Sequence, residues 1–325
     1  PIFNERYVVE RLLRAAVSLD YPRDRLEIQL LDDSTDATRE IASRLVQQYQ
    51  AAGLQVVHLH RTVRTGYKAG ALKEGLAICR GEFVAIFDAD FVPNPDFLRR
   101  TLPFFGDPNV GMVQTRWGHL NRDYSLLTTG QAFGIDGHFG VEQGSRAWAG
   151  LYLNFNGTAG IWRKAAIQDA GGWHADTLTE DLDLSYRAQL KGWRLVFLPD
   201  VVCPAELPVQ IQGFKSQQQR WAKGSIQTAR KLLPSILRAP GSWFKKYQAV
   251  IHLTHYAAHP LMLLVAIASP LLLYLDWFFA SWRSVFASTA FFCLATFGPS
   301  ALYCYSQRVL YPDWRRRLPY LPSLM

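Results

Sequence analysis

Residues 1–206 alternate short apolar runs with segments of helical periodicity. Four apolar or β-branched runs have the length of a strand: 26–31, 55–60, 83–87 and 110–115. Three segments repeat their apolar positions with the period of a helix: 37–50, 66–78 and 182–190. Strands followed by helices are typical of an α/β domain. No glycine-rich phosphate-binding loop follows the first run, so a nucleotide would have to be held in another way.

The carboxy-terminal part contains two long runs without a charged side chain. Tyr247–Leu275 is 29 residues long and Ser284–Gln307 is 24 residues long. About 20 residues cross the hydrocarbon core of a bilayer, so each run is long enough to span it, and a buried core helix is the alternative. The pattern predicts a transmembrane region over residues 247–325, with spans at about 250–275 and 284–306.

The composition agrees with this mixed organisation. Apolar residues make up 49% of the chain and charged residues 19%, which is too apolar for a disordered protein and too charged for a bundle of membrane helices alone. No cleavable signal peptide is visible. The chain begins in a segment typical of the turn after a strand, so we expect a preceding strand to be missing.

Charge divides the chain at about residue 206. Residues 1–206 hold 22 Lys and Arg against 25 Asp and Glu, whereas residues 207–325 hold 13 against 2. The basic segment 207–246 leads directly into the apolar runs, which favours a membrane interface over nucleic acid as its partner. Basic flanks outside both runs, with few charges between the runs, predict that the flanks and the 1–206 domain are cytoplasmic.

Pairs of acidic residues follow two of the predicted strands. Asp32 and Asp33 come after the first strand, and Asp88 and Asp90 come after the third. Ligands of open α/β sheets bind beyond the carboxyl ends of the strands, so a nucleotide is expected near both pairs. Carboxylates at i and i+2 suit Mg²⁺ or Mn²⁺, which would bridge them to a diphosphate. Helix capping by the first pair and ordinary turn chemistry for the second are the alternatives.

Two further groups have both a functional and a structural interpretation. Thr179–Asp181 opens a helical pattern, where acidic side chains also interact favourably with the helix dipole. Gln217–Trp221 begins the basic region, where an interfacial helix would carry the same residue types. Each group alone leaves its role open.

The order of the four groups is more specific than any one of them. An Asp-Asp pair, an Asp-Ala-Asp turn, a Thr-Glu-Asp helix start and a Gln-x-x-Arg-Trp segment before membrane spans resemble the processive glycosyltransferases of family two, the cellulose-synthase-like group. The strings Gly66–Gly75, Val84–Phe91 and Phe155–Arg163 are especially similar to the plant cellulose-synthase-like A and C proteins, which are glucomannan and glucan synthases. The chain departs from them in lacking the amino-terminal membrane helix and first strand, and in having Thr179 where A-type proteins tend to have valine.

The resemblance implies a GT-A-like α/β fold with a doubly wound mixed sheet, a carboxy-terminal interfacial helix and transmembrane helices. It implies that Asp181 is the general base, and that Asp88 and Asp90 hold a divalent metal, Mg²⁺ or Mn²⁺. Gln217 and Trp221 are the implied acceptor contacts. The implied donor contacts are Asp32, Asp33, Lys68, Asp88, Glu180 and Arg220. For Lys68, a solvated position on a helix is the alternative.

The same resemblance predicts an inverting hexosyltransferase of the inner membrane with a cytoplasmic catalytic domain. It would transfer hexose from a nucleotide diphosphate sugar, GDP-mannose or UDP-glucose, to a growing β-glycan such as β-1,4-mannan or glucomannan. A non-processive enzyme that glycosylates a lipid is one alternative. A catalytically silent membrane scaffold with the same fold is the other.

Overall fold

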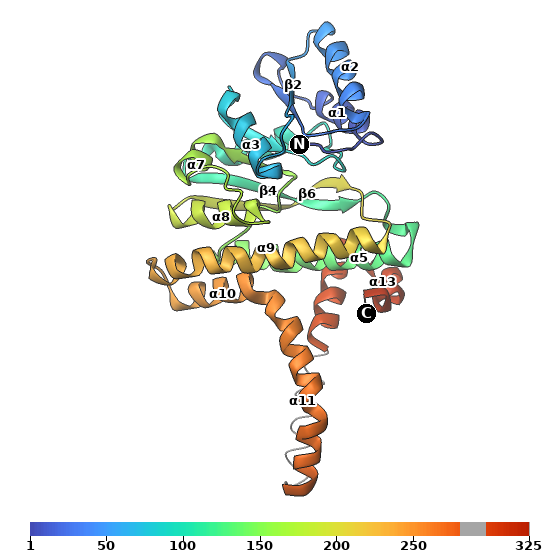
Figure 1. Ribbon diagram of the computed structural model, residues 1–325, viewed down its shortest axis with the longest axis vertical. Helices are drawn as coiled ribbons and strands as arrows, with labels where there is room; N and C mark the ends of the chain where they lie inside the picture. The colour runs from blue at the N-terminus through green and yellow to red at the C-terminus, as the bar shows by residue number, and fades with distance from the viewer. Residues whose placement is uncertain (280–296, 325) are drawn as a thin grey trace.

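The computed structural model describes residues 1–279 and 297–324. It consists of an α/β head, a layer of helices beneath the head and a helical stalk that leaves this layer (Figure 1). The amino terminus lies inside the head, and the carboxy terminus lies against the helical layer (Figure 1).

The smaller sheet of the head contains two parallel strands and is packed against two helices. Leu13, Leu30 and Val46 are buried in the core between strand and helices, which explains why apolar residues recur with helical spacing in this part of the chain. The elements are α1 (Val9–Val17), β1 (Ile28–Asp32), α2 (Thr38–Ala51) and β2 (Val56–His60).

The larger sheet has the strand order β3-β5-β4-β6. β5 runs antiparallel to both of its neighbours, and β4 runs parallel to β6. Met112 of β4 packs into one hydrophobic core and Val113 into another, so this strand is covered on both faces. The strands are β3 (Phe83–Ile86), β4 (Val110–His119), β5 (Gly160–Arg163) and β6 (Arg194–Ala205), and the helices packed around them include α3 (Tyr67–Ile78), α7 (Lys164–Asp169) and α8 (Glu180–Leu190).

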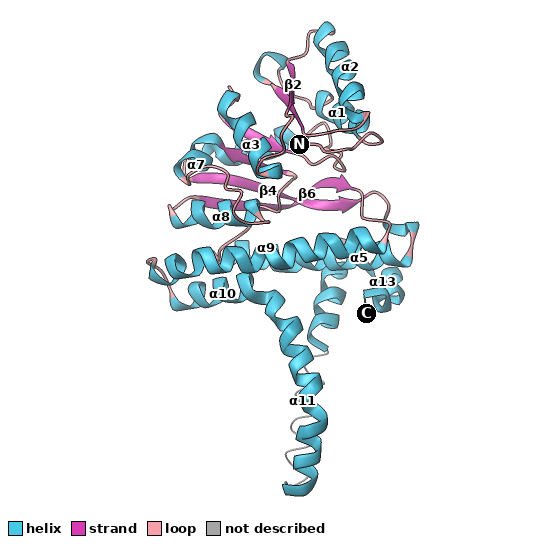
Figure 2. Cartoon of the chain, viewed as in Figure 1, coloured by secondary structure: helices cyan, strands magenta, loops and turns pink. Residues whose placement is uncertain are grey.

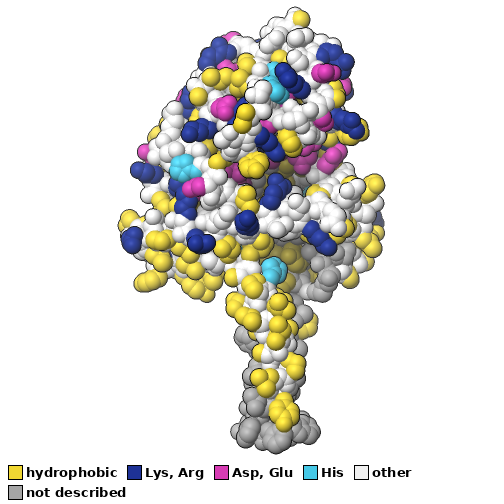
Figure 3. Space-filling view, in the orientation of Figure 1, with side chains coloured by type: hydrophobic (Ala, Val, Ile, Leu, Met, Phe, Trp, Pro, Cys, Tyr) yellow, Lys and Arg dark blue, Asp and Glu magenta, His cyan; other side chains and the backbone are white. Residues whose placement is uncertain are grey.

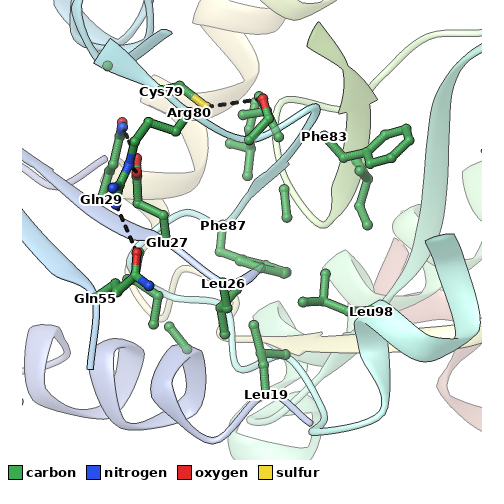
Figure 4. Close-up of a pocket in the computed structure, with 18 of the residues that line it drawn as sticks. Leu19, Leu26, Glu27, Gln29, Gln55, Cys79, Arg80, Phe83, Phe87 and Leu98 are labelled. Carbon is green, nitrogen blue, oxygen red and sulfur yellow. Dashed lines mark hydrogen bonds and ion pairs between the residues drawn. The ribbon is translucent and has the colours of Figure 1, made fainter. Parts of the chain in front are cut away.

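An apolar gap separates the two sheets (Figure 4). Its volume is about 600 Å³, and side chains such as Leu26 and Phe87 line it. At its rim the Arg80 guanidinium donates to a Glu27 carboxylate oxygen at 2.6 Å (Figure 4). Among the described residues, β1 is bridged on this side only by Ile2, and β3 pairs only with β5. The predicted α/β fold with a mixed sheet is confirmed, but because of this gap the strands form two hydrogen-bonded sheets instead of one.

Two long helices, α9 and α10, lie side by side beneath the larger sheet (Figure 2). Tyr186 of α8, Ile236 of α9 and Leu253 of α10 share one hydrophobic core, which attaches this layer to the head. The layer contains α5 (Leu126–Gly137), η4 (His138–Gln143), α6 (Gly144–Trp148), α9 (Ile211–Arg238), α10 (Trp243–Thr254), α13 (Trp314–Arg317) and η6 (Leu318–Leu324). Short helical turns connect the other elements: η1 (Arg23–Arg25), α4 (Phe97–Thr101), η2 (Leu102–Gly106), η3 (Arg122–Tyr124) and η5 (His255–Ala257).

The stalk is formed by α11 (Ala258–Phe279), and hydrophobic side chains follow its surface (Figure 3). Within the described part of the chain, one helical run, Trp243–Leu271, is long and apolar enough to cross a membrane, with 29 residues and a mean hydropathy of 1.5. It overlaps the first predicted span. The second predicted span, 284–306, lies largely outside the described residues, and of it residues 297–306 are helical.

Candidate active site

A cavity of about 520 Å³ lies between the larger sheet and α9. The residues that line it come from distant parts of the chain: α3, the turn after β3, the start of α8 and the first half of α9. Eight of the ten predicted site residues are among them: Lys68, Asp88, Asp90, Glu180, Asp181, Gln217, Arg220 and Trp221. The fold therefore brings three of the four sequence groups to a single cavity.

The turn after β3 presents Asp88 and Asp90 to this cavity. The backbone N–H of Asp88 donates to the Thr158 hydroxyl at 2.9 Å, which fixes the turn against the neighbouring loop. The Lys68 ammonium donates to an Asp88 carboxylate oxygen at 2.5 Å and to the Gly157 carbonyl at 2.9 Å. Burial and the nearby charge of Asp88 raise the pKa of Asp90 to about 7.

These carboxylates fit a divalent cation. Asp88 pairs with the Lys68 ammonium, whereas Asp90 forms no ion pair with any of the described residues, so the negative charge of the two is only partly compensated. Burial and, after it, the charge of Asp88 raise the pKa of Asp90. Carboxylate oxygens are the ligands that Mg²⁺ and Mn²⁺ prefer in proteins, so Asp88 and Asp90 have the chemistry to hold either ion.

Glu180 and Asp181 occupy the first turn of α8 and line the same cavity. Burial and the neighbouring charge of Glu180 raise the pKa of Asp181 to about 7. Gly157 allows a close approach here, because its φ is +82° and a Cβ on it would lie 2.9 Å from Oδ2 of Asp181. A carboxylate with a pKa near neutrality has the properties of a general base.

Gln217, Arg220 and Trp221 lie on one face of α9, because they are three and four residues apart in a helix. All three line the cavity together with the carboxylates. Burial raises the pKa of Glu180, and the positive charge of Arg220 partly opposes this rise. The Arg220 guanidinium is therefore close enough to interact electrostatically with Glu180. A guanidinium can bind phosphate oxygens in a bidentate manner, and an indole offers a flat face to a sugar ring.

Comparison with known proteins identifies the family. Residues 1–224 match the family described as "Glycosyltransferase like family 2". The chain belongs to glycosyltransferase family 2. The predicted family is thus confirmed.

Two plant relatives of this family 2 chain are glucomannan 4-beta-mannosyltransferases. Glucomannan 4-beta-mannosyltransferase 2 of Arabidopsis thaliana is 46% identical over 257 residues, which are 78% of this chain and 48% of that protein. Glucomannan 4-beta-mannosyltransferase 1 of Oryza sativa subsp. japonica is 45% identical over 243 residues, or 73% of this chain and 47% of that protein. The chain therefore spans about half the length of these relatives.

Solved structures share the fold. Mannosyltransferase PcManGT from Pyrobaculum calidifontis, in complex with GDP-Man and Mn²⁺, matches with a TM-score of 0.65 and 25% identity over 100% of this chain and 83% of that chain. S. aureus TarS 1–349 matches with a TM-score of 0.57 and 19% identity over 79% of this chain and 69% of that chain. The second likeness concerns the fold alone. Together these findings confirm the GT-A-like fold of this family 2 chain.

The fourth sequence group, Asp32 and Asp33, does not line the family 2 cavity. Arg61 binds Asp33 through two hydrogen bonds of 2.7 and 2.6 Å, and Arg64 lies 3.6 Å from the same carboxylate. Arg64 itself lines the cavity. Asp33 does not line it, but contacts it indirectly through the ion pair with Arg64. Asp33 thus lies outside the cavity that Asp181 lines, because Arg61 holds its carboxylate in the interior.

Asp32 is fully buried beneath the same wall. Its carboxylate contacts Nε2 of His58 at 2.9 Å and accepts the Ser34 backbone N–H at 2.8 Å. Burial alone would raise the pKa of Asp32, but these hydrogen bonds lower it overall. The capping interpretation of this pair is wrong, because Asp36 accepts the Thr38 N–H at the start of α2. Donor contacts by Asp32 and Asp33 stay a prediction.

Two parts of the cavity wall had no predicted site role. The loop Asn156–Thr158 lies between Lys68 and Asp181, and its Asn-Gly pair, a turn signal within a family-like string, could have pointed to it. His119, at the end of β4, also lines the cavity, and its ring contacts the buried Asp136 at 3.0 Å. No local pattern in the sequence marks His119.

The described residues contain one further group of possible metal ligands, formed by His174, Asp176 and Asp183. The Lys231 ammonium lies 2.8 Å from Asp176, 2.9 Å from Asp183 and 3.0 Å from the His174 ring. The Lys231 ammonium therefore occupies the place of a metal ion and supplies its positive charge. The group therefore joins α8, which carries Asp183, to α9, which carries Lys231.

Proposed function

We propose that this chain is the catalytic part of an inverting, membrane-bound mannosyltransferase that extends a β-linked mannan or glucomannan. The names of the two plant relatives and the GDP-Man bound to PcManGT support mannose as the sugar and GDP-mannose as the donor. The observation that carries the proposal is the single cavity that gathers Asp88, Asp90, Asp181 and Trp221. UDP-glucose is the alternative donor.

The reaction is a single displacement at the anomeric carbon of the donor. A hydroxyl oxygen of the acceptor forms the new bond to this carbon, the bond to the diphosphate oxygen breaks, and Asp181 accepts the hydroxyl proton. One displacement inverts the anomeric configuration, so an α-linked donor gives a β-linked product. The pKa of Asp181, about 7, keeps a substantial share of this carboxyl in its basic form at neutral pH.

The leaving diphosphate needs positive charge around it. Lys68 of α3 and Arg220 of α9 both line the cavity, and both can donate hydrogen bonds to phosphate oxygens. Asp88 and Asp90 would hold Mg²⁺ or Mn²⁺, which when bound supplies a Lewis acid for the diphosphate. Trp221 would stack against the acceptor ring, with Gln217 beside it, and so orient the attacking hydroxyl towards Asp181.

In this proposal the helical layer and the stalk attach the active site to a membrane. The basic residues of α9 precede the apolar run Trp243–Leu271, and Lys245 and Lys246 of α10 lie at its start. Lys245 and Lys246 next to the exposed Trp243 and Phe244 combine charge and aromatic surface, as expected at the cytoplasmic face of a membrane. We place the head in the cytoplasm and the apolar run in the inner membrane, with no role for nucleic acid.

Incubation of membranes that contain the full protein with labelled GDP-mannose or labelled UDP-glucose, each with Mn²⁺, tests the proposal. The expected product is a long polymer formed from GDP-mannose that a β-1,4-mannanase degrades. A short product that partitions into organic solvent would instead identify a lipid acceptor. Protein that releases no nucleoside diphosphate from any donor would overturn the enzymatic assignment in favour of a silent scaffold.

A further inference from the structure

Helix α9 packs tightly at Gly224 against Thr179, the residue that precedes α8. A Cβ on Gly224 would lie 2.5 Å from Cγ2, 2.7 Å from Oγ1 and 2.8 Å from the backbone nitrogen of Thr179. These distances are too short for any side chain, so a residue larger than glycine would push the two segments apart. Glycine in the interior of a helix is otherwise destabilising relative to alanine, and a close helix contact is a physical reason for it.

Both sides of this contact carry cavity residues. Thr179 immediately precedes Glu180 and Asp181. Gly224 follows Arg220 by four residues and Trp221 by three, so all three lie on the same face of α9. The separation of the backbones at Gly224 and Thr179 therefore sets the distance between the proposed base and the proposed acceptor and phosphate contacts.

Polar contacts hold α9 in place around Gly224. The hydroxyls of Thr179 and Thr228 lie 3.2 Å apart, and the Leu178 N–H donates to Gln227 at 2.9 Å. One turn further, Lys231 binds Asp183 at 2.9 Å. With these contacts on one side of Gly224, a clash at this position would tilt the part of α9 that precedes it, which carries Trp221.

We propose that Gly224 is a positioning residue that sets the depth at which α9 presents Arg220 and Trp221 to Asp181. This inference rests on the proposed glycosyl transfer. Thr179 is its partner, because two of the three atoms that a Cβ on Gly224 would meet belong to the Thr179 side chain. Gly224 does not line the cavity, whereas Thr179 does.

The test compares Gly224→Ala with a matched change in the same helix, Gly213→Ala. A Cβ on Gly213 would meet only the Pro208 Cβ, at an ordinary 3.7 Å. Displacements of about 1 Å at a reacting centre cost about 10²-fold in rate, so we expect kcat for sugar transfer to fall by about 10²-fold in Gly224→Ala. We expect the KM for donor to change by less than about tenfold, because Arg220 is the one proposed donor contact on α9, whereas Lys68, Asp88 and Asp90 lie on other elements. Gly213→Ala is expected to keep the wild-type kcat.

Thr179→Ala removes two of the three nearest contacts, those with Cγ2 and Oγ1, and leaves the backbone nitrogen at 2.8 Å. It therefore relieves the clash in part, which separates positioning from a general loss of structure. The double variant Gly224→Ala/Thr179→Ala is expected to recover about tenfold in kcat over Gly224→Ala. An unchanged kcat in Gly224→Ala, an equal loss in Gly213→Ala, or no recovery in the double variant would overturn the inference. If Gly224→Ala does not fold, recovery of folding in the double variant supports it and failure to recover overturns it.

Failure of the proposed function has a different signature in this experiment. In that case wild type and Gly213→Ala would also transfer no sugar from either donor. The Gly224–Thr179 contact is then tested by thermal unfolding of wild type, Gly224→Ala, Thr179→Ala and the double variant. A stability loss in Gly224→Ala that shrinks in the Thr179→Ala background supports the contact, and equal losses in both backgrounds overturn it.

Discussion

The ammonium of Lys68 lies 2.5 Å from a carboxylate oxygen of Asp88. Lys68 is on α3 and Asp88 is in the turn after β3, so this ion pair connects two segments that the sequence leaves unrelated. The interpretation of Lys68 as a solvated helix lysine is wrong, because its side chain faces the cavity and also donates to the Gly157 carbonyl. The lysine is in place to contact a diphosphate.

Lys68→Ala is expected to weaken donor binding. Hydrogen bonds to charged groups contribute about 1.5–3 kcal/mol, which corresponds to a Kd about 10–100-fold higher. Calorimetric titration with GDP and Mn²⁺ measures this directly. Lys73→Ala on the exposed side of the same helix is the control, and similar affinities for the two variants would remove Lys68 from the donor site.

Asp181→Asn is expected to lower turnover by about 10²–10⁴-fold while donor affinity stays nearly constant, because only the proton acceptor is removed. Initial rates of nucleoside diphosphate release, together with GDP binding, separate the two quantities. Asp123→Asn changes an acidic side chain that is 85% exposed and should leave both unchanged. Normal turnover in Asp181→Asn would exclude this residue as the base.

The pH dependence of kcat/KM should report the ionisation of Asp181. Its pKa is raised to about 7, so the carboxyl is increasingly protonated, and inactive as a base, as the pH falls below 7. We expect kcat/KM to decrease about tenfold per pH unit below this value and to level off above it. A profile that stays flat between pH 5 and 8 would contradict the assignment.

Asp90→Ala is expected to abolish the metal dependence of donor binding. The variant removes one of the two carboxylates that fit Mg²⁺ or Mn²⁺ and lowers the negative charge of the cavity. Calorimetry with GDP, in the presence and absence of Mn²⁺, provides the measurement, and Asp96→Ala at an exposed position of the following segment is the control. Metal-dependent binding that survives in Asp90→Ala would move the metal site elsewhere.

Local patterns predicted the elements well, because they depend on neighbours in the chain. The strand predicted at 110–115 is present as β4, although it continues to His119 where it pairs with β6. The helix predicted from Leu182 starts two residues earlier, because Glu180 and Asp181 form its first turn. The order of the acidic and Arg-Trp groups predicted the family and most of the cavity.

Long-range contacts account for what the sequence did not reveal. Asp33 is held inside by Arg61, which is 28 residues away, and no local pattern encodes such a pair. The gap between β1 and β3 is likewise a property of two sheets that meet only in three dimensions. The raised pKa values of Asp90 and Asp181 arise from burial, which a pattern of residue types does not specify.

The tethered ammonium of Lys231 has a consequence for handling the protein. Lys231 is part of the chain and neutralises Asp176 and Asp183 in place of a metal ion, so a chelating agent cannot remove this positive charge. If Asp88 and Asp90 hold an ion as proposed, a chelator that removes it should leave α8 and α9 joined through Lys231. The empty protein can then be reloaded with different ions, so that the effect of each ion on transfer can be compared on an unchanged scaffold.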